Sequence, residues 1–183
     1  MEVYMAKHIP NILTIIRFFL IPFIIIFALQ SNYIVATIFL ILSGITDIAD
    51  GFIARKFNFI TDFGKLMDPL ADKCTQIATL LVLVIQGIIP AWILVIVIIK
   101  EIMLVAGASF LYGKDLVVSS KWYGKISTVL FYVAIFCSMI IKQFHLPYTF
   151  DNYIYYVAVG LTIFSLFMYG KAFYIKDFLK KEK

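Results

Sequence analysis

The sequence contains little charge and little cysteine. Only 15% of its 183 residues are charged whereas 63% are hydrophobic, a far more apolar composition than that of a soluble domain. Its two cysteines, Cys74 and Cys137, lie in separate apolar stretches without the short spacing of a redox or zinc motif. There is no internal repeat and no low-complexity segment. We therefore expect two small buried thiols, and neither a disulfide scaffold, a zinc site nor a repeat array.

Long apolar runs fill the chain instead. Each is about 20 residues long, enough for an α-helix to cross the hydrocarbon core of a bilayer. Because the runs use nearly all of the chain, we predict an all-α integral membrane protein. It would be a six-transmembrane-helix bundle forming a single domain over residues 1–183. The predicted spans are Asn11–Leu29, Tyr33–Ile53, Leu66–Gln86, Ala91–Leu111, Trp122–Ile141 and Tyr153–Tyr174.

Basic residues predict the orientation of this bundle. Twelve of them cluster at the two termini and around the connectors after the second and fourth spans, whereas the other three connectors contain only Lys142. The positive-inside rule then places both termini and the connector between the second and third spans in the cytosol, in a multi-pass protein of the cell membrane. Topology and attraction to anionic headgroups account for the net charge of +5. Without a soluble surface for a basic patch, nucleic-acid binding is not expected.

Four carboxylates lie in or beside the second and third predicted spans. Asp47 and Asp50 are three residues apart near the end of one span, and Asp68 and Asp72 are four residues apart near the start of the next. Each pair therefore shares a helix face. A charge at the centre of a membrane helix costs about 2.5–3.5 kcal/mol on insertion scales, and less near the interface. Four such charges require compensation.

Two divalent cations would match these four acids in charge. A ligand set of oxygen atoms, without histidine or cysteine, favours Mg²⁺ or Mn²⁺ over Zn²⁺. Clustered carboxylates that hold two such ions are a known device for displacement at phosphorus. Nearby small residues, Gly51, Ala54 and Gly64, leave room for a neighbouring helix or a ligand phosphate. The pattern predicts a two-metal site at headgroup level that acts on a phosphate ester.

The spacing of these residues resembles a known family. Asp47-x-x-Asp50-Gly51-x-x-Ala54-Arg55, eight further residues and then Gly64-x-x-x-Asp68-x-x-x-Asp72 is similar to the complete motif of the CDP-alcohol phosphatidyltransferases, with all eight fixed positions matched. The resemblance implies a dimeric six-helix enzyme with two Mg²⁺ or Mn²⁺ ions in a site open to the cytosol. By the same resemblance, four residues would ligate the metals and four would contact the CDP-linked lipid. The metal ligands would be Asp47, Asp50, Asp68 and Asp72, and the lipid contacts Gly51, Ala54, Arg55 and Gly64.

The expected reaction is an in-line attack by an alcohol oxygen on the metal-bound pyrophosphate of the lipid, with CMP as the leaving group. A carboxylate within hydrogen-bond reach takes the alcohol proton. The resemblance assigns this role of general base to Asp72. Because coordination lowers the basicity of a carboxylate, the role of Asp72 as a ligand is the firmer prediction.

Two further segments resemble the glycerol-phosphate branch of the family, the phosphatidylglycerophosphate synthases, and the related cardiolipin synthases. In the first, Asn11, Thr14 and Arg17 follow a three-residue step along one helix side. Facing inward, they would present an amide, a hydroxyl and a guanidinium to the phosphate or ribose of CDP-diacylglycerol. The second segment and the fourth span add lysines that suit an acceptor with a phosphate, such as glycerol 3-phosphate. These lysines are Lys100, Lys121 and Lys125.

The acceptor stays open on two counts. Lys100 stands where this branch usually has an arginine, which binds phosphate with a planar fork, and Ser127 stands where a second lysine is frequent. Fewer cationic donors favour a different acceptor, and phosphatidylglycerol, which would give cardiolipin, is the alternative. An ion-coupled transporter is the alternative of another class. Transporters bind at the bilayer midplane between repeated halves, whereas these acids lie at one end of their spans.

The charged residues also have structural interpretations. Arg17 can extend to the membrane interface, and Lys100 and Glu101 can form structural ion pairs with other spans. Lys121 and Lys125 can be ordinary charges of the cytosolic side. For the four acids the alternative is a network neutralised by basic residues near them in the sequence, Arg55 and Lys73. We disfavour this network because four acids outnumber two bases.

Overall fold

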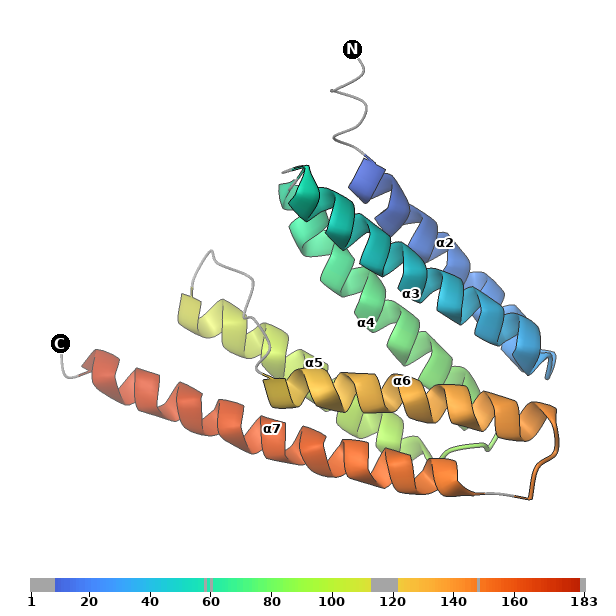
Figure 1. Cartoon of the computed structure of the whole chain (residues 1–183). Coiled ribbons are helices and arrows are strands. Elements are labelled where there is room, and N and C mark those ends of the chain that lie inside the picture. The colour runs from blue at the N-terminus through green and yellow to red at the C-terminus, as the bar shows by residue number, and fades with distance from the viewer. Residues whose placement is uncertain (1–8, 58, 60, 113–121, 148, 182–183) are drawn as a thin grey trace, which may run out of the picture. The chain divides into compact units, whose positions relative to one another are not determined.

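The computed structural model describes residues 9–57, 59, 61–112, 122–147 and 149–181. These residues form six helices, with no strand among them (Figure 1). The predicted all-α class and helix number are therefore confirmed. The helices are α2 (Ile9–Leu29), α3 (Tyr33–Lys56), α4 (Asp62–Ile85), α5 (Ala91–Tyr112), α6 (Trp122–Gln143) and α7 (Phe150–Lys181).

Four stretches of helix within the described residues are long and apolar enough to cross a membrane. They are Pro10–Leu29, Tyr33–Lys56, Gly124–Gln143 and Phe150–Met168. The helix α4 is outside this set, and its first half carries the acidic residues of the predicted site. Membrane crossing by α4 and α5 stays a prediction, as does the orientation of the bundle.

The chain divides into two compact units, which we describe separately. One contains α2, α3 and α4 together with residues 139–146, which include the last turn of α6. The other contains α5, the rest of α6 and α7. That residues 1–183 act as a single domain stays a prediction.

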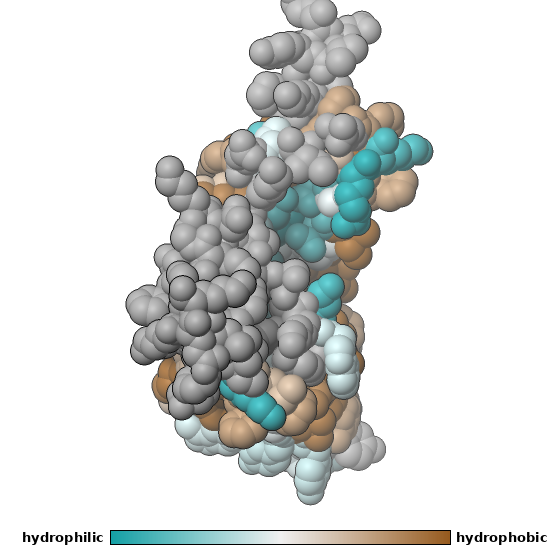
Figure 2. Space-filling model, turned by 90° about the vertical axis from the view of Figure 1, so that its left-hand side faces the viewer, coloured by the Kyte–Doolittle hydropathy of each residue, from teal (hydrophilic) through white to brown (hydrophobic). Residues whose placement is uncertain are grey.

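In the first unit α2 packs along both α3 and α4, and Figure 1 shows the three helices side by side. Small residues at the contact, Ala28, Ala36 and Ala71, are fully buried and allow the backbones to approach closely. Large apolar side chains such as Phe19 and Ile48 are exposed, as suits helices whose outer faces meet lipid. Figure 2 shows a hydrophilic patch beside hydrophobic surface in the upper part of that view.

One end of this unit is held together by Gln86, the residue that follows α4. Its amide Nε2 donates a hydrogen bond to the carbonyl oxygen of Ala28 at 2.7 Å, and its Oε1 accepts one from the hydroxyl of Tyr33 at 3.2 Å. The end of α2, the start of α3 and the end of α4 are thereby joined. The acidic residues lie toward the opposite end of α3 and α4.

The second unit buries its own polar contacts. The hydroxyl of Ser138 donates to a carboxylate oxygen of Asp151 at 2.7 Å, in the first turn of α7. The hydroxyls of Ser127 and Thr162 lie 2.5 Å apart and join α6 to α7. These bonds satisfy side chains that would otherwise be costly in an apolar interior.

Candidate functional site

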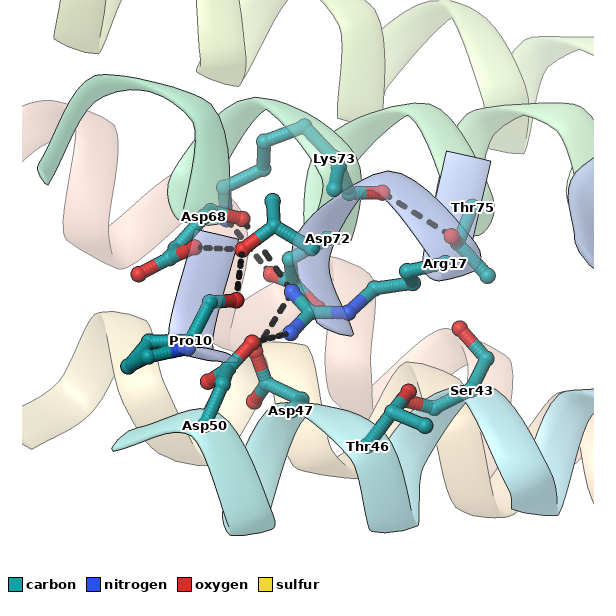
Figure 3. Close-up of polar contacts among 12 residues, drawn as sticks. Pro10, Arg17, Ser43, Thr46, Asp47, Asp50, Asp68, Asp72, Lys73 and Thr75 are labelled. Carbon is teal, nitrogen blue, oxygen red and sulfur yellow. Dashed lines mark hydrogen bonds and ion pairs between the residues drawn. The ribbon is translucent and has the colours of Figure 1, made fainter. Parts of the chain in front are cut away.

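The two acids of α3 converge on one cation from α2. The Arg17 guanidinium forms an ion pair with Asp47, at 2.6 Å from Nη1 to Oδ1, and a second pair between Nη2 and Oδ2 of Asp50. Figure 3 shows the guanidinium pointing toward both carboxylates. Asp47 and Asp50 share a face because they are three residues apart on a helix. That part of the sequence prediction is confirmed.

Burial makes this contact unusual. Arg17 is 1% exposed and Asp50 is also buried, whereas Asp47 is 49% exposed. The interpretation that Arg17 extends to the interface is therefore wrong. The neutralising residue of the α3 acids is Arg17, which is distant in sequence, rather than the nearby Arg55 and Lys73 that we considered as the alternative.

The acids of α4 join the same polar cluster. The hydroxyl of Thr14 donates to Oδ1 of Asp68 and lies 3.1 Å from the carbonyl oxygen of Pro10. Nη1 of Arg17 also donates to the main-chain oxygen of Asp68 at 3.4 Å. Asp72 is half-buried, and the ammonium of Lys73 lies 3.7 Å from its Oδ2. Thr14 and Arg17, one turn apart, thus connect α2 to the acid-bearing face of α4.

A third set of contacts fixes the start of α4. Thr61 is the N-cap: its hydroxyl oxygen accepts from the N–H of Gly64 at 3.0 Å and donates to Oδ1 of Asn11 at 2.7 Å. A Cβ atom on Gly64 would lie 3.1 Å from the Thr61 hydroxyl, 3.2 Å from the Asn11 amide oxygen and 3.7 Å from Oδ2 of Asp68. A side chain at Gly64 would therefore require these polar neighbours to shift by a few tenths of an ångström.

The remaining predicted lipid contacts lie at the end of α3. Arg55 is exposed, and its guanidinium lies over Gly51, where an added Cβ would be 3.5 Å from Nη2. Ala54, one residue earlier, is half-buried. An added Cβ at Gly51 would be in ordinary van der Waals contact with the guanidinium of Arg55, one turn further along.

The predicted acceptor lysines belong to the second unit. Lys100 is buried and pairs with Glu101 at 2.8 Å from Nζ to Oε1, and it lies 3.4 Å from the Thr128 hydroxyl. The ion pair of Lys100 therefore joins neighbouring residues of α5, and its contact with another helix is the one with the Thr128 hydroxyl on α6. Lys125 is exposed on α6, and Lys121 lies outside the described residues.

The donor chemistry of the acidic cluster fits a hard cation, because its side chains offer carboxylate oxygens. Two of those carboxylates already point at one shared positive group. In this arrangement, however, no group of three or more acidic, histidine or cysteine side chains in the described part of the chain surrounds a common position suitable for a metal ion. Ligation by all four acids therefore stays a prediction.

Comparison with known proteins decides the family. The model of the CDP-alcohol phosphatidyltransferase family matches residues 7–164. The chain belongs to the CDP-alcohol phosphatidyltransferase family. The predicted membership, the enzyme class and the role in phospholipid biosynthesis by phosphatidyl transfer from a CDP-linked lipid are thereby confirmed. Enzymes of this family depend in general on divalent metal ions.

Several curated relatives share one name, CDP-diacylglycerol–glycerol-3-phosphate 3-phosphatidyltransferase. The protein of Bacillus subtilis is 31% identical over 86% of this chain and 91% of its own length. That of Haemophilus influenzae is 32% identical over 90% and 92%, and that of Mycoplasma genitalium 30% identical over 92% and 84%. The similarity therefore extends through both compact units.

Two polar residues of this phosphatidyltransferase were not among the predicted site residues. Thr61 stands three residues before Gly64, and this N-cap spacing was readable from the sequence. Gln76 continues the four-residue row of Asp68 and Asp72 by one further turn. It is fully buried, and neither its amide nitrogen nor its oxygen has a hydrogen-bond partner among the described residues.

Substitution of Gly64 by alanine tests the crowding at the start of α4. We expect Gly64→Ala to lower the free energy of unfolding by about 1–3 kcal/mol, because the added methyl must push apart Thr61 and Asn11. Gly44→Ala is the matched control, since it is also helical and has nothing within 4 Å of an added Cβ. Chemical unfolding in detergent measures both. Equal stabilities of the two variants would contradict the crowding.

Proposed function

We propose that this protein transfers a phosphatidyl group from CDP-diacylglycerol to glycerol 3-phosphate, giving phosphatidylglycerophosphate and CMP. The observation that supports it most is the convergence of Arg17, Thr14 and the acids of α3 and α4 at one end of a three-helix unit. Relatives named for this reaction cover most of the chain. We further propose that the acidic end faces the cytosol, where a soluble acceptor arrives.

The acids would hold two Mg²⁺ or Mn²⁺ ions. Bound there, the ions supply positive charge that binds the pyrophosphate and balances the charge developing on departing CMP. The proposed ligands are Asp47, Asp50, Asp68 and Asp72. Half-exposed Asp47 and half-buried Asp72 are accessible to a substrate, whereas Asp50 lies deeper.

The chain's own residues then orient the substrates. We assign Asn11, Thr14 and Arg17 on α2, with Gly51, Ala54, Arg55 and Gly64, to the CDP-linked lipid. Asp72 accepts the proton of the acceptor hydroxyl as its oxygen bonds to the phosphatidyl phosphorus. The bond from that phosphorus to the bridging oxygen breaks in the same displacement, and CMP leaves with that oxygen.

Lys100, Lys121 and Lys125 are the proposed contacts of the acceptor phosphate. Lys125 is the best placed of the described lysines, because it is exposed, whereas Lys100 is buried against Glu101. Two copies of the chain are expected to assemble, as the resemblance implies.

An acceptor panel tests the reaction. Purified protein with CDP-diacylglycerol and Mg²⁺ should release CMP with glycerol 3-phosphate and form phosphatidylglycerophosphate, identified by mass. If phosphatidylglycerol is the only alcohol that gives product, it is the acceptor in place of glycerol 3-phosphate, as in a cardiolipin synthase. The panel also contains serine and inositol phosphate. If no alcohol in it leads to CMP release, the proposed enzymatic activity is refuted.

Asp47→Asn and Asp68→Asn should each lower CMP release by about 10³-fold or more, because each removes a charged ligand from a site that acts by electrostatic stabilisation. Membrane insertion should persist, since an amide is easier to insert than a carboxylate. Asp151→Asn, which changes a buried acid of the second unit, is the control for loss of one carboxylate. Near-wild-type turnover in either ligand variant would contradict the metal assignment.

Lys125→Ala should raise the KM for glycerol 3-phosphate by about 5–50-fold, as expected for the loss of one charged hydrogen bond to a phosphate. The KM for the CDP-linked lipid should change little. Lys142→Ala is the matched control, because Lys142 is likewise exposed on α6 but lies near its other end. Equal changes in the two KM values would argue against an acceptor contact.

A further inference from the structure

The guanidinium of Arg17 occupies the place in the cluster where positive charge is needed. It is almost completely buried, it pairs with both acids of α3, and it reaches the main-chain oxygen of Asp68 on α4. A single side chain from α2 thus contacts the two acid-bearing helices (Figure 3). Any other cation that binds the same oxygens of Asp47 and Asp50 must compete with it.

Charge makes this competition strong. Asp47 and Asp50 carry two negative charges and Arg17 carries one positive charge. The three side chains together keep one net negative charge, which attracts a further cation. A divalent ion on the same oxygens would lie within about 4 Å of the guanidinium, where like charges repel by several kcal/mol at an effective dielectric constant of 20. Both cannot be held by the same two carboxylates at once.

Arg17 is also incompletely satisfied where it lies. Its two terminal nitrogens are engaged by the acids, but Nε has no hydrogen-bond partner among the described residues. Guanidinium groups bind phosphate with two parallel hydrogen bonds, frequently through Nε and one terminal nitrogen. The side chain therefore retains a donor for an oxyanion that the acids do not use.

We propose that Arg17 is the resident counter-ion of the acidic site, and that divalent metal ions bind by displacing its guanidinium from Asp47 and Asp50. This inference rests on the proposed metal-dependent transfer. Once displaced, the guanidinium binds a phosphate oxygen of the CDP-linked lipid. Arg17 is in this sense a positioning residue, because it holds the α3 acids together before the metal does.

A linkage between the two ligands follows from this exchange. A metal ion releases Arg17 for the lipid phosphate, and the lipid phosphate removes Arg17 from the acids. Each ligand therefore strengthens the binding of the other by the same factor. The site would hold metal weakly until the lipid arrives.

The test is Mn²⁺ binding without lipid, measured from the electron paramagnetic resonance signal of free Mn²⁺ with purified protein in detergent. Arg17→Gln should bind Mn²⁺ with a Kd about tenfold lower than that of the wild type, because the competing cation is gone. Lys142→Gln removes the same charge from an exposed position of the same unit and should leave the Kd unchanged. An unchanged or higher Kd in Arg17→Gln overturns the proposal.

Thermal unfolding distinguishes competition from a purely structural role. Without metal, Arg17→Gln should melt below the wild type, since two acids lose their partner, and Mn²⁺ should raise its Tm by more than that of the wild type. If Arg17→Gln does not fold, Arg17→Lys replaces it in the test. Lysine keeps the positive charge but lacks the two parallel N–H donors of the guanidinium, so it should compete less well with Mn²⁺, and the Kd should lie below that of the wild type. A Kd equal to or above the wild-type value in that variant also overturns the proposal.

The same samples separate this inference from the proposed function. Failure of wild-type protein to bind Mn²⁺ even with CDP-diacylglycerol present, or binding that Asp68→Asn leaves intact, contradicts the metal site itself. Wild-type binding and CMP release, without tighter binding in the Arg17 variants, contradict only the exchange. In turnover assays Arg17→Gln should raise the KM for CDP-diacylglycerol and leave that for the acceptor alone.

Discussion

The ion pairs between Arg17 and the two carboxylates of α3 are the interaction on which the rest of the site depends. In an apolar bundle an unpaired charge is far more costly than a paired one, and a buried arginine requires acids at matching depth. The pairs therefore set the register between α2 and α3. Thr14, one turn earlier on α2, sets the register against α4 through its bond to Asp68.

The contacts that join the three helices at one end are distinct from the contacts of the proposed site at the other end. The three helices of the first unit are held at one end by the neutral amide of Gln86, where no charge is involved. At the other end they are held by charges and hydroxyls that a substrate or an ion can take over. The proposed reaction would need such replaceable contacts, because the pyrophosphate of the CDP-linked lipid would have to enter among the acidic residues.

Much of this was readable from the sequence. The apolar runs predicted all six helices. The observed bounds differ most at the start of α4 and at the end of α7, where charged residues extend the helix beyond its apolar part. The three- and four-residue spacings placed Asp47 beside Asp50 and aligned Asp68 with Asp72. The same three-residue step placed Thr14 and Arg17 on one side of α2, and the structure shows that this side meets the acids rather than only the predicted substrate.

The ion-pair partner of Asp47 and Asp50 could not be predicted from the sequence. Spacing defines which face of a helix a residue occupies, but pairing across helices depends on rotation and depth, which packing determines. The sequence suggested Arg55 and Lys73 as alternative neutralising residues. Lys73 does pair with Asp72, whereas Asp47 and Asp50 pair with Arg17, about 30 positions away. Gln76 was missed for a related reason, because the sequence does not show whether an amide in an apolar stretch has hydrogen-bond partners.

The bond from Gln86 to the last turn of α2 has a mechanical consequence. A rigid rod that rotates about one end moves most at the other, and at 1.5 Å per residue α2 is roughly 32 Å long and α3 and α4 are roughly 36 Å long. A rotation of about 5° at the Gln86 contact would separate the far ends of the helices by about 3 Å, by the geometry of a rigid rod. Asp47 and Asp68 lie short of those tips, so they would separate by less, and the contact at Gln86 would limit how far the acidic cluster opens.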